Sequence, residues 1–141
     1  MRIVLAAKPG ADQPWVADAV IDLARQTGAS VAVVAVDAVE LERLAAAPRS
    51  VSAERAEEAA AAAAQRIAGA GIEVTTAVLP GRPLDRILGF AESEAADLIV
   101  VGSSGRPAVA QRLLGSVPLE LIEKSARPVL VITHPHRPDG P

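Results

Sequence analysis

The chain has 141 residues, an apolar share of 50% and a net charge of −3, which predicts one domain with one hydrophobic core. The absence of cysteine excludes disulfides, thiolate metal sites and cysteine nucleophiles. Basic residues are scattered, aromatic residues are almost absent and no apolar run reaches membrane-spanning length, so we expect neither a nucleic-acid partner nor a membrane partner.

The first third of the chain predicts a strand, a helix and a second strand. Residues 2–7 form a short apolar run typical of a buried strand. Apolar residues then recur at helical spacing up to Gly28, with Asp12 offering an N-cap and Pro14 in the first turn. Residues 30–37 are β-branched and continuous, which favours a second strand.

The remaining segments continue this alternation. Ser52 offers a cap for an alanine-rich helix to about residue 70, and residues 72–79 predict a third strand. Residues 80–83 predict a turn into a third helix that contains Leu84 and Ile87. The last elements expected are a strand at 97–101, a helix at 117–125 and a strand at 127–132. We expect one domain over residues 1–133 and a mobile tail over 134–141, which is rich in proline.

Alternating strands and helices predict an α/β fold: an open parallel five-stranded sheet with helices on both faces. Ligands of such sheets bind outside the carboxyl ends of the strands, where the strand order reverses. One segment in the right place has the residues for this role. Gly102 and Gly105 follow an apolar strand, and Gly115 and Ser116 precede a helix. Glycines let the backbone approach a ligand, and a helix N-terminus offers free N–H groups to phosphate.

The pattern Gly-x-x-Gly, nine residues, then Gly-Ser resembles the nucleotide-binding signature of the universal stress protein family. The first strand, the strand at 97–101 and the closing strand also resemble that family, so the likeness covers nearly the whole chain. The resemblance implies strand order 3-2-1-4-5, a dimer, and ATP or AMP as ligand in many members. In that order, the loops that begin at Lys8 and Gly102 face each other across one crevice.

The resemblance also implies the site residues. Ribose and phosphate positions of the family correspond to Val101, Gly102, Ser104 and Gly105, and an adenine position corresponds to Val36. Gly115, Ser116 and Val117 would supply N–H groups and a hydroxyl to the outer phosphates, with Arg106 as a loose partner. For Val36 and Val101 the alternative is plain core, and for Arg106 it is a solvated loop side chain.

Two positions depart from the family pattern. Lys8 stands where nucleotide-binding members usually carry aspartate, and an ammonium group donates hydrogen bonds but accepts none. Base or ribose recognition would therefore weaken, while attraction for an anion would increase. Pro118 lies in the first turn of the expected phosphate-binding helix and lacks an N–H group, although proline is common at the first helical position.

Other kinds of site find little support. The chain has no P-loop and no dinucleotide fingerprint. A flavin site would need a hydroxyl-rich first loop and aromatic residues. His134 and His136 lie in the expected tail without an acidic or cysteine partner, so we predict no metal site. No catalytic set of serine, histidine and aspartate is legible.

These observations lead to two hypotheses of function. The first is a non-catalytic, cytoplasmic stress or signalling module that binds ATP or AMP, with or without Mg²⁺, and reports nucleotide state to an unknown protein partner. The second is a nucleotide-free dimeric regulatory or structural domain, and slow ATP hydrolysis is a minor third. The apolar strand 129–132 would leave an exposed edge, so we expect it to pair with its twin in a homodimer.

Overall fold

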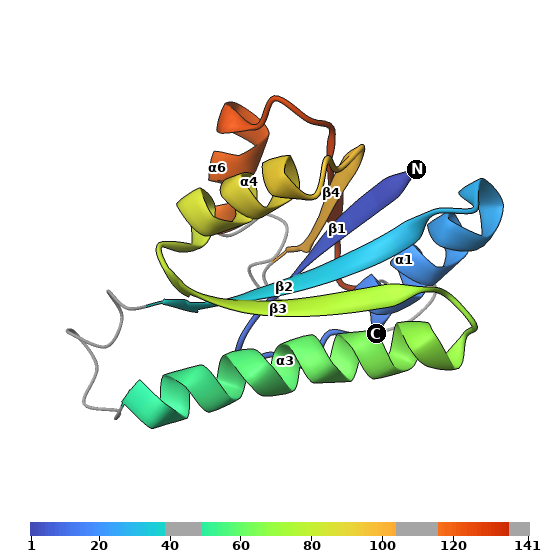
Figure 1. The fold of residues 1–141 in the computed structure, drawn as a ribbon. Helices are drawn as coiled ribbons and strands as arrows, with labels where there is room; N and C mark the ends of the chain where they lie inside the picture. Colours follow the sequence, from blue (N-terminus) through green and yellow to red (C-terminus); the bar gives the residue numbers. More distant parts are fainter. Residues whose placement is uncertain (39–48, 104–115, 136–141) are drawn as a thin grey trace.

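The computed structural model describes residues 1–38, 49–103 and 116–135. They form three layers, with a parallel sheet between two helical layers (Figure 1). The elements, in chain order, are β1 (Arg2–Ala7), α1 (Pro14–Thr27), β2 (Ser30–Ala38), α3 (Arg49–Gly69), β3 (Val74–Gly81), α4 (Pro83–Ser93), β4 (Leu98–Gly102), α6 (Ser116–Lys124) and β5 (Val129–Ile132).

The sheet has the order β3-β2-β1-β4-β5, and all of its strand pairs are parallel. This confirms the predicted fold class and strand order. The central strand β1 pairs with β2 through Ala6↔Val34 and with β4 through Ala6↔Val101. The strand order therefore reverses between β1 and β4, and their carboxyl ends lie at one edge of the sheet.

Strand residues alternate between two apolar clusters, one on each face of the sheet. Ile3 and Leu5 of β1 pack with α1 and α3, whereas Val4 and Ala6 pack with α4 and α6. Both clusters are aliphatic, and alanines on α3 let that helix lie close to the sheet. A sheet buried on both faces explains why its strands read as continuous apolar runs instead of alternating ones.

A polar clamp holds the amino ends of the strands. The backbone N–H of Arg2 donates to the Asp97 carboxylate over 2.7 Å, and the Asp97 N–H donates back to the Arg2 carbonyl over 2.8 Å. The Arg2 guanidinium also donates to Ser30 on β2 and forms an ion pair with Glu94. These contacts lie at the end of the sheet opposite the expected site, so their role is structural.

Two predicted helix caps are wrong. The N-cap of α1 is Gln13, and no side chain caps that helix, although Pro14 does occupy its first turn. Ser52 lies inside α3, where its hydroxyl donates to the buried Asp37 carboxylate over 2.7 Å. The predicted end of α1 is confirmed, because Gly28 adopts a left-handed conformation with φ of 72° and donates to the Ala24 carbonyl.

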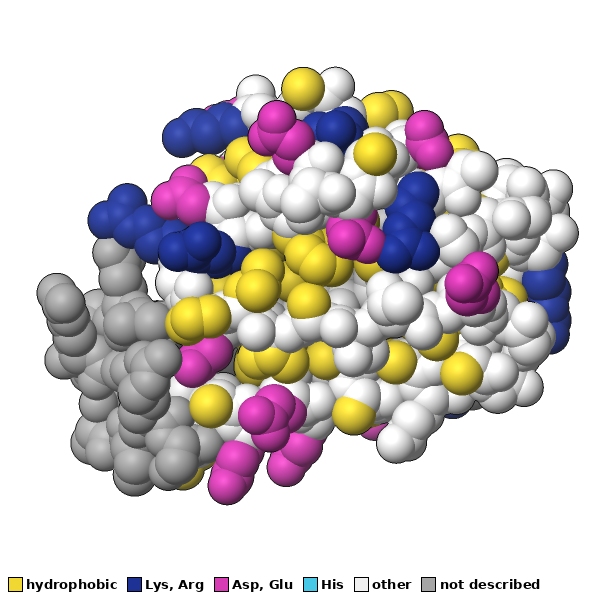
Figure 2. Space-filling view, in the orientation of Figure 1, with side chains coloured by type: hydrophobic (Ala, Val, Ile, Leu, Met, Phe, Trp, Pro, Cys, Tyr) yellow, Lys and Arg dark blue, Asp and Glu magenta, His cyan; other side chains and the backbone are white. Residues whose placement is uncertain are grey.

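Figure 2 shows one face of the molecule, on which Lys and Arg side chains are interspersed with Asp and Glu. Apolar side chains gather in the middle of this face, between α4 and α3. Positive charge forms no single stripe on this face. Among the helices that the structure describes, none is long and apolar enough to cross a membrane.

Beyond β5, the ring of His134 packs against Trp15 at the start of α1, with ring centroids 4.4 Å apart and ring planes tilted by 59°. The expected mobile tail starts at His134, and residues 136–141 of it, with His136, lie outside the described residues.

Candidate functional site

The candidate site lies where the carboxyl ends of β1 and β4 meet. Lys8 follows β1, and Gly102 is the last residue of β4. The first of these strands leads to α1 on one face of the sheet, and the second leads toward α6 on the other face. The helices that follow the two strands therefore lie on opposite faces of the sheet, and this is the geometry in which parallel α/β sheets bind ligands.

Gln13 fixes the end of β4 against α1. Its Nε2 donates to the Ser103 carbonyl over 3.1 Å, and the Ser103 N–H donates to the Ile132 carbonyl over 2.9 Å. Ser103 is 4% exposed. The strand end is thus held from two sides, by the helix start and by β5.

Gly102 is required by this packing. A Cβ at this position would lie 2.6 Å from Gln13 Oε1 and 2.9 Å from Val16 Cγ2. Any side chain here would displace the amino end of α1. The glycine therefore has a packing role, and the role predicted from the sequence, close approach of backbone to a ligand, stays a prediction.

Three valines among the predicted site residues come together in the apolar cluster between the sheet, α4 and α6. Val36 and Val101 are 5% and 6% exposed, and Val117 packs against them as a half-buried residue. The alternative that Val36 and Val101 are core residues agrees with this burial. Because the side chains of Val36 and Val101 are buried, these residues would contact a ligand through their backbone at the strand ends.

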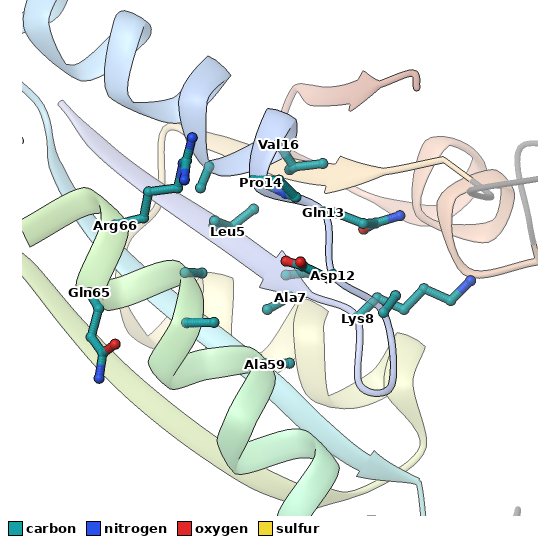
Figure 3. A pocket seen from close by; sticks show the side chains of 15 residues that line it. Leu5, Ala7, Lys8, Asp12, Gln13, Pro14, Val16, Ala59, Gln65 and Arg66 are labelled. Atoms are coloured by element: carbon teal, nitrogen blue, oxygen red, sulfur yellow. The ribbon is translucent and has the colours of Figure 1, made fainter. Parts of the chain in front are cut away.

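Lys8 directly follows β1 and is exposed on the connection between β1 and α1. The connection turns tightly: the Ala11 N–H donates to the Lys8 carbonyl over 3.3 Å, and Gly10 has φ of 77°. Figure 3 shows the Lys8 ammonium group pointing away from α3, as does the Gln13 side chain, which reaches the end of β4. The positive charge therefore lies on the side of the connection that faces away from α3 (Figure 3).

Several predicted residues lie outside the described part of the chain: Ser104, Gly105, Arg106 and Gly115. Ser116 is the first residue of α6, in agreement with the expected helix start, and the buried Pro118 lies in the first turn. Because proline lacks an N–H group, the backbone donors at this helix start come from residues that precede it.

Sequence reasoning missed Gln13 and Ser103. A glutamine before a helix gives no signal of its own, because its partner lies 90 residues away. The strand alternation does place Val101 and Gly102 on opposite faces, and it could have suggested that Gly102 meets α1. In the described residues, no group of three or more acidic, histidine or cysteine side chains could hold a metal ion.

A cavity of about 440 Å³ lies beside the same connection, between α1 and α3. Of the predicted site residues that the structure describes, Lys8 alone lines it. Asp12 points into this space, whereas Gln13 points toward β4 (Figure 3). Consecutive residues of one loop therefore serve two different places in the molecule.

Comparison with known proteins agrees with the fold. Residues 1–133 match the model of the universal stress protein family. A universal stress protein of Methanocaldococcus jannaschii is 40% identical over 67 residues, which cover 48% of this chain and 39% of that protein. The matched segment thus spans about two fifths of this curated relative.

Solved structures match over most of the chain. A universal stress protein of Archaeoglobus fulgidus has a TM-score of 0.77 and 28% identity, covering 94% of this chain and 98% of its own. The structure of the universal stress protein from the same organism in complex with dAMP has a TM-score of 0.71 and 26% identity, covering 94% and 97%. On the evidence of its sequence and its fold, this chain belongs to the universal stress protein family.

Proposed function

We propose that this protein is a non-catalytic adenine-nucleotide-binding module, with ATP or AMP at the carboxyl ends of β1 and β4. The observation that carries the proposal is the meeting of these two strand ends at the reversal of strand order, with α6 beginning at Ser116. The related protein of Archaeoglobus fulgidus in complex with dAMP supports the class of ligand.

In this proposal the phosphates lie at the start of α6, near Gly115, Ser116 and Val117, where backbone N–H groups and the helix dipole favour negative charge. Ser104, Gly105 and Arg106 contact the ribose and phosphates. The ammonium group of Lys8 faces the outer phosphates from the end of β1, and Mg²⁺ accompanies ATP. Nucleotide state is then passed to a protein partner in the cytoplasm.

Lys8 determines the selectivity of this site. An ammonium group cannot accept a hydrogen bond from the adenine amino group, so we expect weak discrimination between ATP and GTP. The Lys8 ammonium group also attracts the negative charge of the phosphates, so ATP binds more tightly than AMP. Lys8→Asp should restore adenine preference by about 1–3 kcal/mol, the cost of a lost polar contact in a buried site.

Calorimetric titration of ATP, GTP and AMP against the wild type and Lys8→Asp measures these preferences. The chain has one other lysine, Lys124, at the end of α6, and Lys124→Asp is the matched control. Gly115→Val with Ser116→Ala should abolish binding while the circular dichroism spectrum stays unchanged. Strong adenine selectivity that Lys8→Asp leaves untouched would show that other groups read the base. No binding by any form would favour the nucleotide-free alternative.

We also infer that residues 1–133 act as one domain and that two copies pair through β5. This strand ends the sheet, and Leu130 is 36% exposed on it. The neighbouring helix α6 exposes about half of Leu119 and of Ile122. An edge strand with uncovered apolar side chains is stabilised by pairing with its twin across a two-fold axis.

A further inference from the structure

We propose that the cavity between α1 and α3 is a second binding site, separate from the nucleotide site, for a small organic cation with an apolar body. Its volume of about 440 Å³ falls within the range of about 300–1,000 Å³ that is usual for small-molecule sites. The β1–α1 connection forms one wall, and α1 and α3 form the others (Figure 3).

The walls of the cavity favour an apolar body. Leu5 and Ala7 of β1 form the floor, Val16 belongs to α1, and Ala59 and Ala63 belong to α3. The alanines explain why the cavity exists, since larger side chains at their positions would fill the space between the helices. A flat or compact hydrocarbon group can occupy it without displacing a polar group of the protein.

One charged group is directed into this space. The Asp12 carboxylate points between the two helices, while the Lys8 ammonium group and the Gln65 side chain point away from it (Figure 3). In the part of the chain that the structure describes, no hydrogen bond occupies the Asp12 carboxylate, which is exposed at the mouth of the cavity. A carboxylate accepts hydrogen bonds and does not donate them, so the ligand must bring N–H donors.

Two positively charged residues also line the cavity, Lys8 and Arg66, and Arg66 is paired. Arg66 of α3 donates through Nε to Asp18 over 2.6 Å and through Nη2 over 3.1 Å. Arg66 therefore holds α3 against α1, and its charge is balanced by Asp18. With Lys8, which also lines the cavity, Asp12, Asp18 and Arg66 sum to zero charge. The Asp12 carboxylate is nevertheless the charge directed into the space, while the Lys8 ammonium group points away (Figure 3), so a cation inside the cavity meets the carboxylate first.

The two sites share the β1–α1 connection, because Lys8 and Gln13 also line the cavity, but the side chains that we assign to the two sites point in different directions (Figure 3). Gln13 points from this connection to Ser103, and Asp12 points to α3. None of Val36, Val101 and Gly102 lines the cavity. A nucleotide at the end of β4 and a cation between the helices would therefore touch opposite sides of one loop.

The experiment uses benzamidine as the cationic probe and benzamide as its neutral counterpart of the same shape. Both are titrated into the isotope-labelled protein, and amide chemical shifts are followed. We expect saturable benzamidine shifts at residues 11–13 and 59–66, and at least tenfold weaker binding of benzamide. Asp12→Asn should weaken benzamidine about tenfold, while Asp22→Asn, the same change on the exposed side of α1, should leave it unchanged.

A second variant tests the cavity itself. Ala63→Leu fills the space and should abolish benzamidine binding without changing ATP affinity, and a thermal melt checks that the variant is folded. Benzamidine binding that does not depend on Asp12, or shifts that lie away from these residues, would overturn the proposal. Loss of ATP binding in Ala63→Leu, or displacement of benzamidine by ATP, would show a single shared site. Failure to bind ATP at all leaves the benzamidine result valid and contradicts only the proposed function.

Discussion

Gly102 is the residue at which β4, the start of α1 and the proposed nucleotide site meet. The nearest atoms to a Cβ built there belong to two side chains, one flexible and one β-branched. Gln13 can rotate away, but Val16 is 4% exposed and has no space to move into. The position therefore tolerates no side chain without a shift of the helix.

Gly102→Ala should destabilise the protein by about 1–3 kcal/mol, the usual cost of excess volume in a well-packed core. Urea unfolding followed by circular dichroism measures this change. Gly89 of α4 is the matched control, because a Cβ there meets no atom within 4 Å. Gly89→Ala should stabilise the helix by about 0.5–1 kcal/mol. Equal effects at both glycines would mean that the contacts with Gln13 and Val16 do not constrain position 102.

At the scale of the elements, an ion pair joins the two helices on one face of the sheet. Asp18 of α1 and Arg66 of α3 are each about half exposed. The Arg66 side chain lowers the pKa of Asp18 below 3.8, through its hydrogen bond and, to a smaller extent, through its charge. Because both partners contact solvent, the contribution to stability is small.

The sign of the pH dependence follows from the lowered pKa. The folded protein prefers ionised Asp18, so the stabilisation is complete above the unfolded value of 3.8 and is lost as the pH falls through the lower folded value. Wild type should exceed Asp18→Asn in free energy of unfolding near pH 6, and the difference should shrink below pH 3.8. Urea titrations at several pH values measure it, with Asp22→Asn as control. A difference that is independent of pH would assign the effect to packing.

The sequence predicts the type and order of the elements because buried strands and apolar helix faces leave strong patterns. It predicts their ends less well, because tertiary partners set them. β3 lies two residues later than expected: β2 continues to Ala38, which pairs with Gly81, and an edge strand accommodates Pro80. Ser52 lies inside α3, where it forms a hydrogen bond with Asp37 of β2, a partner that its local sequence does not reveal.

The residues of the candidate site are also predicted only where local sequence features reveal them, and not where tertiary contacts decide. Local chemistry predicts the strand before Gly102 and a helix from residue 117, one residue after its observed start at Ser116, since an apolar strand run and a glycine-serine pair before a helical pattern are visible in the chain. The contact of Gln13 with Ser103 and the direction of Asp12 depend on how α1 lies on the sheet. No spacing in the sequence encodes that placement.

At the scale of the whole molecule, β5 leaves one edge of the sheet open for a second copy. Light scattering should give about twice the mass of one 14.4 kDa chain at micromolar concentration. Leu130→Glu should give monomers, because it places a charge on the apolar edge. Thr76→Glu, an exposed position on the opposite edge strand β3, is the control. A monomeric wild type, or a Leu130→Glu dimer that is still folded by circular dichroism, would exclude pairing through this strand.

The central place of β1 also has a consequence for synthesis of the chain. Its first partner, β2, is made soon afterwards, and the unit from β1 to β3 is complete at Gly81. Its other partner, β4, ends only at Gly102. At about 5–20 residues synthesised per second, the apolar edge of β1 stays unpaired for roughly one to four seconds between the completion of β3 and that of β4. During that interval the nascent sheet exposes an edge of a strand whose residues Ile3 to Ala6 are buried in the finished protein, and a chaperone that shields this edge would raise the yield of folded protein.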